Sequence, residues 1–270
     1  MHVESEFGRR SVTSHLEINH RFRAAFQDRL IRWYRAHRRD LPWRETRDAY
    51  HVAVSELLLQ QTQASRVAPV YREFVRRYPT IEDLHLAPAD EVSALTDPLG
   101  YHIRGKWLKA MAAVIVTDHA GRMPDSLEGL RRLPGLGPYA AAAVHTFGNR
   151  KRAPLVDTNI ARVYTRAVGL PSKGSTYRDS RRLAELAEAL TPARRFYDYG
   201  QGLMDLGATV CTARAPDCPR CPLRKLCRDL TGGPPVAVWR VDGVSVAAER
   251  TAGYRVGSRA TPRRKVSTDA

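Results

Sequence analysis

Apolar residues recur at helical spacing along most of the chain. In the segment HRFRAAFQDRLIRWYRAHRR, which starts at residue 20, steps of three and four residues mark an apolar stripe of Phe22, Phe26, Leu30, Trp33 and Tyr34. One apolar stripe on an otherwise charged segment is typical of an amphipathic helix. After Pro42 the periodicity continues, and Pro or Gly residues separate successive segments. No convincing series of strands interrupts it, so the sequence predicts an all-α fold.

Two segments flank this periodic part and lack its pattern. Residues 1–19 mix Ser, Glu, Arg and His without periodicity, and we expect them to form a mobile N-terminal segment. Residues 231–270 are rich in Gly, Pro, Ser and Arg, and we expect a basic, flexible tail that is too short for another sizeable domain. Residues 20–230 remain for the folded core, as one domain or as two intimate lobes.

The charge balance points to a nucleic-acid partner. Lys and Arg total 44 against 28 Asp and Glu in 270 residues, which leaves a formal charge of +16. Such an excess is the electrostatic footprint of a nucleic-acid binder, although many proteins are basic for other reasons. No apolar stretch is long enough to span a bilayer, and the opening MHVESEFGRR lacks the apolar core of a signal peptide. We expect the protein to be a monomer that binds no membrane. We expect it in the cytoplasm of a bacterial-type cell, associated with the nucleoid.

A glycine turn precedes a run of alanines in LPGLGPYAAAAV, residues 133–144. The glycines allow positive φ angles and close approach of a partner, and Pro138 suits the first turn of a helix. The free N–H groups at such a turn can hold an anion, such as a DNA phosphate. A tight helix–helix connection without a ligand is the alternative.

All four cysteines fall within residues 211–227, with the spacing C-x6-C-x2-C-x5-C: Cys211, Cys218, Cys221 and Cys227. Cysteines crowded into one loop favour a metal site over a disulfide framework, which would join distant loops. Four thiolates suit either tetrahedral zinc or an iron–sulfur cluster. A structural zinc site usually has two close pairs, whereas this loop has one pair flanked by two single cysteines.

The glycine turn and Asp157, twenty residues after Gly137, together resemble the helix-hairpin-helix, Gly/Pro-rich loop and aspartate (HhH-GPD) superfamily of DNA base-excision glycosylases. Alone, an aspartate before this segment reads as a helix cap. The resemblance implies an active-site role for Asp157 and a two-lobed fold with its active site between the lobes. It places the hairpin lobe at about residues 45–150, and the second lobe at 20–44 plus 151–230. The cysteine spacing is similar to the 4Fe-4S cluster loop of the endonuclease III and MutY branches.

The segment YHVAVSELLLQQTQASRV resembles the corresponding part of the MutY adenine glycosylases, which puts Glu56 in the position of their catalytic glutamate. From its surroundings alone, Glu56 is an ordinary helix carboxylate beside apolar leucines. As a protonated acid in a desolvated pocket it can donate to the leaving adenine. Asp157, kept ionised, can then stabilise the oxocarbenium-like sugar.

Tyr139 occupies the position at which members that also cut the DNA backbone carry a lysine. Without that amine no Schiff base forms there, so the resemblance implies a monofunctional hydrolase with Tyr139 in the base pocket.

The remaining site residues follow one by one from the same resemblance. Gln60, Gln61 and Gln63 match the polar segment that fills the gap left by a flipped base, or else they are solvated helix residues. Tyr101 matches an aromatic wedge beside the opposite base, or else it is a core tyrosine. The DNA-contacting set is completed by the hairpin and by the LPWR segment at the pocket entry: Leu133, Gly135, Gly137 and Arg44.

The leading hypothesis is therefore excision of adenine mispaired with guanine or 8-oxoguanine in double-stranded DNA. The first alternative is thymine or uracil excision from mismatches with guanine, by the same superfamily. The second is a non-catalytic iron–sulfur protein that binds DNA. Typical MutY proteins carry a further C-terminal domain that recognises 8-oxoguanine, and we expect this chain to lack it.

Overall fold

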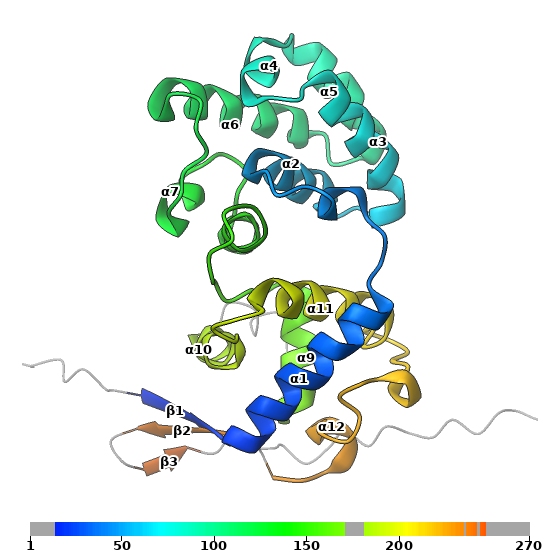
Figure 1. Cartoon of the computed structure of the whole chain (residues 1–270), viewed down its shortest axis with the longest axis vertical. Helices are drawn as coiled ribbons and strands as arrows, with labels where there is room; N and C mark the ends of the chain where they lie inside the picture. Colours follow the sequence, from blue (N-terminus) through cyan, green and yellow to red (C-terminus); the bar gives the residue numbers. More distant parts are fainter. Residues whose placement is uncertain (1–13, 171–180, 235, 242–243, 247–270) are drawn as a thin grey trace, which may run out of the picture.

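The computed structural model describes residues 14–170, 181–234, 236–241 and 244–246. Most of these residues are helical, as the apolar periodicity predicts. Figure 1 shows the helices gathered into an upper and a lower lobe. The chain crosses between the lobes at residues 38–48, which include the short helix η1 (Pro42–Arg44), and again at residues 149–157. None of the described helices is long and apolar enough to cross a membrane.

Each lobe has its own set of elements. The upper lobe contains α2 (Ala49–Leu59), α3 (Ala64–Arg77), α4 (Ile81–Leu86), α5 (Ala89–Thr96), η2 (Asp97–Leu99), α6 (Ile103–His119), α7 (Leu127–Arg131), α8 (Pro138–Ala143) and η3 (Val144–Gly148). The lower lobe contains β1 (Ser14–Ile18), α1 (His20–His37), α9 (Thr158–Val168), α10 (Arg181–Leu190), α11 (Phe196–Thr209), η5 (Cys218–Arg220), α12 (Arg228–Thr231), β2 (Ala237–Val241) and β3 (Val244–Val246).

Helix α1 buries the stripe that its sequence predicts. Asn19 caps it by accepting a hydrogen bond from the Phe22 N–H at 3.1 Å. Phe26 and Leu30 are fully buried, and α1 packs along α11. Trp33 is only half-buried and stacks on His37, with ring centroids 5.5 Å apart. The stripe therefore attaches α1 to the core of the lower lobe.

Helix α2 is apolar on nearly every side. Asp48 caps it with a 2.7 Å hydrogen bond from the Tyr50 N–H, and the residues from Val52 to Leu58 are all buried. A helix with this composition is covered on all faces. Its one carboxylate, Glu56, is therefore buried as well.

The alanine run packs closely against α2. Ala141 and Ala143 are fully buried in α8, and the helix continues into the π-helical turn η3. A Cβ added to Gly148 would lie 2.6 Å from the Ala49 Cα. Small residues thus let η3 and α2 approach more closely than larger side chains allow.

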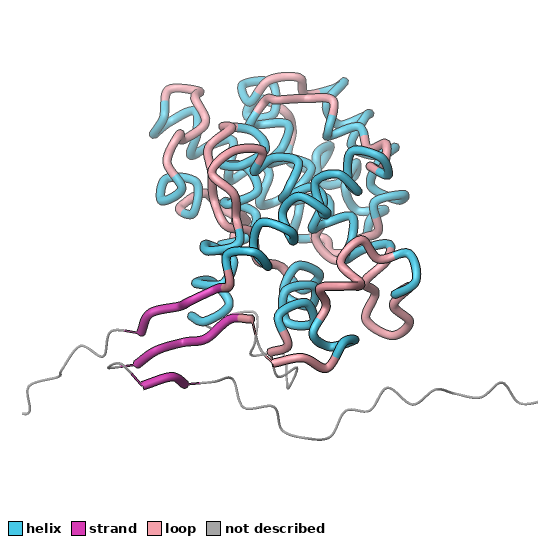
Figure 2. The backbone as a smooth tube through the Cα atoms, turned by 60° about the horizontal axis from the view of Figure 1, so that its bottom comes forward, coloured by secondary structure: helices cyan, strands magenta, loops and turns pink. Residues whose placement is uncertain are grey.

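The helical fold predicted from the sequence is confirmed, and it carries one small antiparallel sheet, coloured magenta in Figure 2. β1 pairs with β2, with Ser14 opposite Val241 and Ile18 opposite Ala237, and β3 extends the sheet. Residues 14–18 and 237–246 were expected to lie in mobile ends. That prediction is wrong for the described strands, because pairing across more than 200 residues leaves no local periodicity. Residues 1–13 and 247–270, also predicted to be mobile, lie outside the described residues.

Candidate active site

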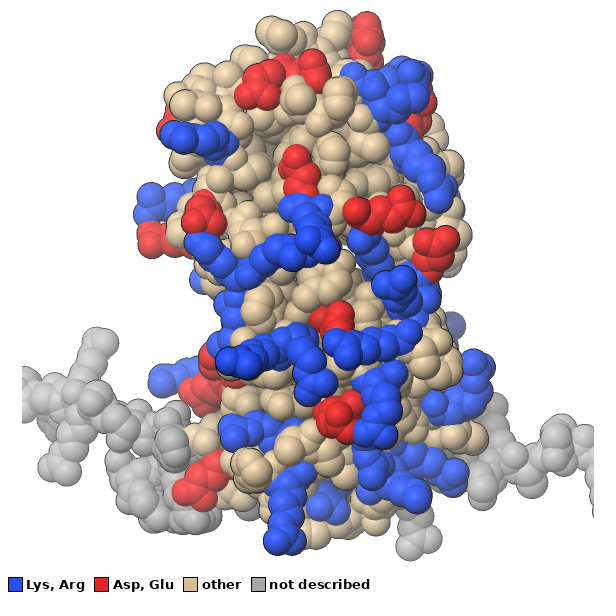
Figure 3. Space-filling view, in the orientation of Figure 1, with Lys and Arg blue, Asp and Glu red and all other residues tan. Residues whose placement is uncertain are grey.

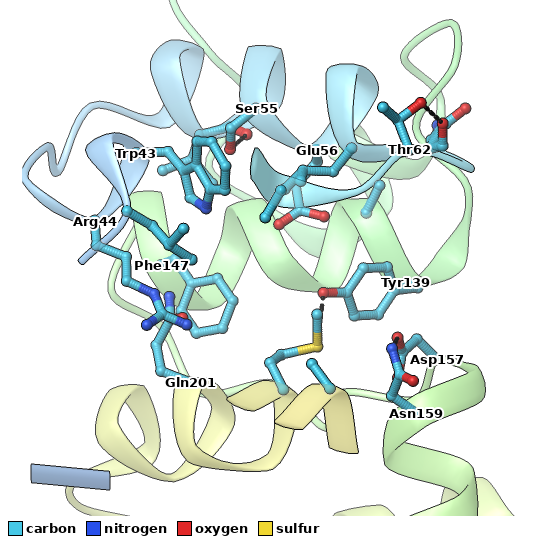
Figure 4. Close-up of a pocket in the computed structure, with 18 of the residues that line it drawn as sticks. Trp43, Arg44, Ser55, Glu56, Thr62, Tyr139, Phe147, Asp157, Asn159 and Gln201 are labelled. Atoms are coloured by element: carbon cyan, nitrogen blue, oxygen red, sulfur yellow. Dashed lines mark hydrogen bonds between the residues drawn. The ribbon is translucent and has the colours of Figure 1, made fainter. Parts of the chain in front are cut away.

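A cavity of about 750 Å³ lies between the lobes. Figure 4 shows Glu56 pointing into it from α2, Tyr139 beside it, and Asp157 at the start of α9. Several residues predicted from the sequence line this cavity: Arg44, Glu56, Gln60, Gln63, Gly137, Tyr139 and Asp157. The fold thus gathers residues that are up to 113 positions apart in the sequence, counted from Arg44 to Asp157.

The surroundings of Glu56 favour its protonated form. Its side chain is buried, and none of the described residues donates a hydrogen bond to its carboxylate. Burial first, and the charge of Asp157 second, raise the pKa of Glu56 to about 8. At neutral pH the group holds a proton that it can donate.

Asp157 is the N-cap of α9, as its position in the sequence also allowed. Its Oδ1 accepts the Ile160 N–H at 2.7 Å, and its Oδ2 accepts the Asn159 side-chain amide at 3.3 Å. Burial raises the pKa of Asp157, while these hydrogen bonds lower it. Because it is hydrogen-bonded at the positive end of a helix, Asp157 is the better site for the negative charge of the pair.

A chain of hydrogen bonds behind Asp157 was missed in the sequence. The Arg162 Nη2 donates to the Asn159 Oδ1 at 2.8 Å, and its Nε donates to the Cys211 carbonyl at 2.7 Å. Asn159 and Arg162 are three residues apart and therefore lie on one face of α9. That three-residue spacing is the sequence signal that could have predicted the contact between the two side chains. The hydrogen bonds connect Asp157, through Asn159 and Arg162, to the start of the cysteine loop.

Tyr139 spans the space between the lobes. Its hydroxyl donates to the Met204 Sδ on α11 at 3.2 Å, drawn dashed in Figure 4. Burial raises the pKa of Tyr139 well above its usual value, and the charges of Glu56 and Asp157 raise it further. The tyrosine is therefore neutral, and no lysine is among the described residues that line the cavity. Nothing in the sequence singles out Met204.

Gly135 shows why the hairpin requires glycine. Its φ is +79°, and an added Cβ would lie 2.7 Å from the Leu57 Cδ2 and 2.9 Å from the Trp107 Cβ. A larger residue would be strained in its backbone and would also clash with both side chains. The turn is therefore pressed against α2 and α6.

The hairpin has two glycines whose N–H groups are free and one buried leucine. The N–H groups of Gly135 and Gly137 donate to no other described group, so they are free to bind an anion. Leu133, predicted to contact DNA with them, is instead buried, and its N–H donates to the Leu130 carbonyl. Its apolar side chain packs in the core and holds the turn in place.

The glutamine segment and Tyr101 lie beside the hairpin. Gln60 donates to the Gly135 carbonyl at 3.1 Å, and Gln63 lines the cavity. Gln61 is exposed with a φ of +55°, and Tyr101 is 39% exposed with a φ of +31°. Tyr101 is therefore not a core tyrosine, and both side chains are accessible from outside.

Arg44 does not have the free guanidinium expected of a DNA contact. Its Nη1 and Nη2 donate to the two oxygens of Asp205 at 2.9 and 2.8 Å, and Nη1 also donates to the Arg39 carbonyl. This bidentate pair is almost fully buried. Arg44 therefore ties the first crossing segment to α11 and also lines the cavity, and its contact with DNA stays a prediction.

The cysteine loop follows α11 and packs against α9. The Arg166 Nη1 lies 3.5 Å from the Cys211 Sγ and donates to the Thr212 carbonyl at 2.7 Å. Burial raises the pKa of the Cys221 thiol to about 11 and also raises the pKa of the Cys227 thiol, whose Sγ donates to the Arg166 carbonyl at 3.4 Å. Among the described residues, no three His, Cys, Asp or Glu side chains lie close enough together to hold one metal ion. The Arg166 guanidinium beside the Cys211 sulfur suits a thiolate at that position.

A family model described as "HhH-GPD superfamily base excision DNA repair protein" matches residues 54–189, about half of the chain. The thymine/uracil-DNA glycosylase of Methanothermobacter thermautotrophicus is 36% identical over 206 residues, which cover 76% of this chain and 93% of that protein. The chain belongs to the HhH-GPD superfamily. Human adenine DNA glycosylase is 39% identical over 213 residues, again 76% of this chain. The chain spans about two fifths of the length of that relative.

A solved structure supports the HhH-GPD fold directly. A thermostable thymine-DNA glycosylase superposes with a TM-score of 0.72 at 34% identity, over 79% of this chain and 98% of the other. The relatives are named DNA glycosylases, which are hydrolases acting on N-glycosyl bonds. They divide between adenine and thymine or uracil, so superfamily membership identifies the type of reaction and leaves the base open.

Proposed function

We propose that this HhH-GPD protein is a monofunctional DNA glycosylase that removes adenine mispaired with guanine or 8-oxoguanine. The observation that carries the proposal is the pair of carboxylates in one cavity, one protonated and one hydrogen-bonded as an anion: Glu56 and Asp157. Binding alone would need neither group. The partner is double-stranded DNA, acted on by a single copy of the chain.

The chemistry follows from the two environments. Adenine leaves poorly as an anion, so a proton from Glu56 to a ring nitrogen assists cleavage of the glycosidic bond. Asp157 then stabilises the positive charge that develops on the sugar, and water attacks the sugar carbon. The target base must leave the helix to reach the cavity.

Hydrolysis without backbone cleavage is supported by the cavity lining, whose described residues include Tyr139 and no lysine. A Schiff base needs a nucleophilic amine near the sugar carbon, and Tyr139 offers only a neutral hydroxyl. We therefore expect the product to be an abasic site. Borohydride treatment during turnover should trap no covalent protein–DNA adduct.

The surface around the site suits a DNA backbone. In the view of Figure 3, Lys and Arg side chains gather across the middle and lower parts of the molecule. The free N–H groups of Gly135 and Gly137 add phosphate donors beside the cavity. Gln61 and Tyr101 are exposed on the same lobe, where they can enter the space left by the flipped base.

Adenine is favoured by the sequence of the cavity wall, where SELLLQQTQ resembles the MutY segment. Thymine or uracil opposite guanine is the second candidate, supported by the match over 93% of the thymine/uracil-DNA glycosylase of Methanothermobacter thermautotrophicus. A single-turnover panel of labelled duplexes with A·8-oxoG, A·G, T·G and U·G pairs separates the two. Cleavage of the adenine strand after hot alkali supports the proposal, and cleavage only at T·G or U·G transfers the enzyme to the second candidate. Inactivity on all four favours a DNA-binding protein without catalysis.

We also propose that the cysteine loop holds a 4Fe-4S cluster as a structural and DNA-docking element. Its ligands would be Cys211, Cys218, Cys221 and Cys227, and exposed basic residues decorate the loop: Arg214, Arg220, Arg224 and Lys225. Metal and sulfide analysis of the purified protein tests this. About four iron and four sulfide per chain support the cluster, whereas about one zinc per chain contradicts it.

A further inference from the structure

Arg104, in the first turn of α6, is buried without an acidic partner. Its side chain is 0% exposed, and no described carboxylate forms an ion pair with it. Burial of an uncompensated charge is costly, so such an arginine requires a full set of hydrogen-bond acceptors. The segments that supply these acceptors are therefore the segments that Arg104 holds in place.

Four of the five acceptors come from two turns, and the fifth is a carbonyl of α2. The Arg104 Nε donates to the Leu57 carbonyl at 3.1 Å, at the end of α2. Its Nη2 donates to the Gln60 carbonyl and, at 2.6 Å, to the Thr62 hydroxyl. Its Nη1 donates to two carbonyls in the turn before α6, those of Gly100 at 2.8 Å and Tyr101 at 3.3 Å. One guanidinium thus joins the glutamine turn (residues 60–63) to the tyrosine turn (residues 100–102).

Each turn holds a non-glycine residue in the left-handed region of backbone space. Gln61 has a φ of +55° and Tyr101 a φ of +31°. Such conformations persist only where the surrounding structure enforces them. The Arg104 hydrogen bonds reach the carbonyl immediately before Gln61 and the carbonyl of Tyr101 itself.

Further contacts reinforce the link between the turns and extend it to the hairpin. The Thr62 hydroxyl also approaches the Leu99 carbonyl at 3.3 Å. The Tyr101 ring lies 5.4 Å from the Arg104 guanidinium and 5.6 Å, edge-on, from Trp107. Trp107 in turn lies against Gly135 of the hairpin.

We propose that Arg104 is a positioning residue that holds the two turns as one rigid unit, so that Gln61 and Tyr101 enter the duplex together when the target base leaves it. This inference rests on the proposed function. Two side chains that already have the inserted geometry lose less freedom on binding than two independent loops. Arg104 thus assists extrusion of the base and not cleavage of the bond.

The test compares paired and unpaired targets with Arg104→Lys, which keeps the charge but cannot reach all five acceptors. Single-turnover excision is measured at saturating enzyme on adenine opposite 8-oxoguanine, and on adenine in a single-nucleotide bulge. We expect about a tenfold loss on the paired target and less than about twofold on the bulge, where little extrusion energy is needed. Fluorescence of 2-aminopurine beside the target should rise more slowly on mixing. An equal loss on both duplexes, or no loss on either, overturns the proposal.

Lys109 on the same helix supplies the matched control. Its ammonium donates to the carbonyls of Leu84, His85 and Ala87 at 2.9, 2.6 and 2.6 Å, away from both turns. Lys109→Met removes a partly buried cation that, like Arg104, donates to backbone carbonyls. We expect the ratio of the excision rate on the paired target to the rate on the bulge to equal that of the wild type. If Lys109→Met changed this ratio as much as Arg104→Lys does, the effect would come from reduced stability of the whole lobe, and the proposal would be wrong.

A milder variant covers the case in which Arg104→Lys fails to fold. Thr62→Val removes one acceptor and leaves the arginine, so we expect a selective loss of about threefold on the paired target, restored by Thr62→Ser. If Thr62→Val leaves the paired rate unchanged, the proposal is wrong. If the wild type excises from neither duplex, it is the proposed function that fails.

Discussion

The two walls of the cavity each carry one carboxyl group, in opposite electrostatic environments. On the α2 wall, Glu56 sits among apolar side chains and accepts no hydrogen bond from the described residues. On the α9 wall, Asp157 accepts two hydrogen bonds at the start of a helix, and Arg162 lies close behind it. A carboxylate in the first environment keeps its proton, and one in the second is stabilised as an anion.

This difference assigns the acid and the anion without reference to the substrate. Both groups are buried, and the charge of Asp157 raises the cost of ionising Glu56. In such a pair, one negative charge goes to the better-solvated site. The hydrogen bonds of Asp157 make it that site. Substitutions of Asp157 and of Glu56 should therefore change the excision rate by different amounts.

The largest effect should come from removing the anion. Asp157→Asn keeps a good N-cap for α9, so the fold and duplex binding should survive. Excision should fall about a thousandfold or more, because no charge remains to stabilise the sugar cation. Single-turnover kinetics beside a gel-shift titration measures both properties. Retained turnover would show that Asp157 is not the anion.

Removing the acid should cost somewhat less. Glu56→Gln cannot donate a proton, so adenine excision should fall about a hundredfold or more. Glu128→Gln is the control, because Glu128 is an exposed helix residue paired with Arg132. Equal rates for Glu56→Gln and this control would favour a pyrimidine substrate or another acid.

The wild type should lose activity as the pH rises through about 8, by about tenfold per further pH unit, because ionised Glu56 has no proton to give. Stability should change in the same direction. With its pKa raised from 4.5 to about 8, folded Glu56 binds a proton that the unfolded chain releases, so the free energy of unfolding decreases across that range. Glu56→Gln should flatten both profiles, which kinetics and chemical denaturation at several pH values can check. Unchanged profiles would show that Glu56 does not titrate there.

The smallest effect should come from the support behind the anion. Asn159→Ala removes one hydrogen bond from Asp157, which should raise the pKa of that carboxylate and lower the rate about fivefold near neutral pH. The loss should shrink at higher pH, where the weakened anion is ionised again. Asn149→Ala, which removes a bond to the Pro124 carbonyl outside the cavity, is the control. A loss independent of pH would indicate a purely structural role.

Much of this site could be predicted from local sequence. Gly135, Gly137 and Asp157 follow a strong spacing pattern, and the structure places the two glycines and the aspartate beside or within the cavity. The contacts of Leu133 and Arg44 with DNA stay predictions. Both residues belong to the right segments, but one side chain is taken up by the core and the other by Asp205. A motif locates a segment and does not show which of its side chains remain free.

The sequence by itself determined the helices, their caps, the glycine turn and the cysteine spacing, because each depends on residues within a few positions of one another. Only the tertiary structure decided the pairing of β1 with β2, the contacts of Arg104 with two distant turns, and the environments of the carboxylates. Whether Glu56 keeps its proton depends on desolvation, and desolvation depends on every element that covers α2. That information is distributed over the whole fold, so no local pattern can contain it.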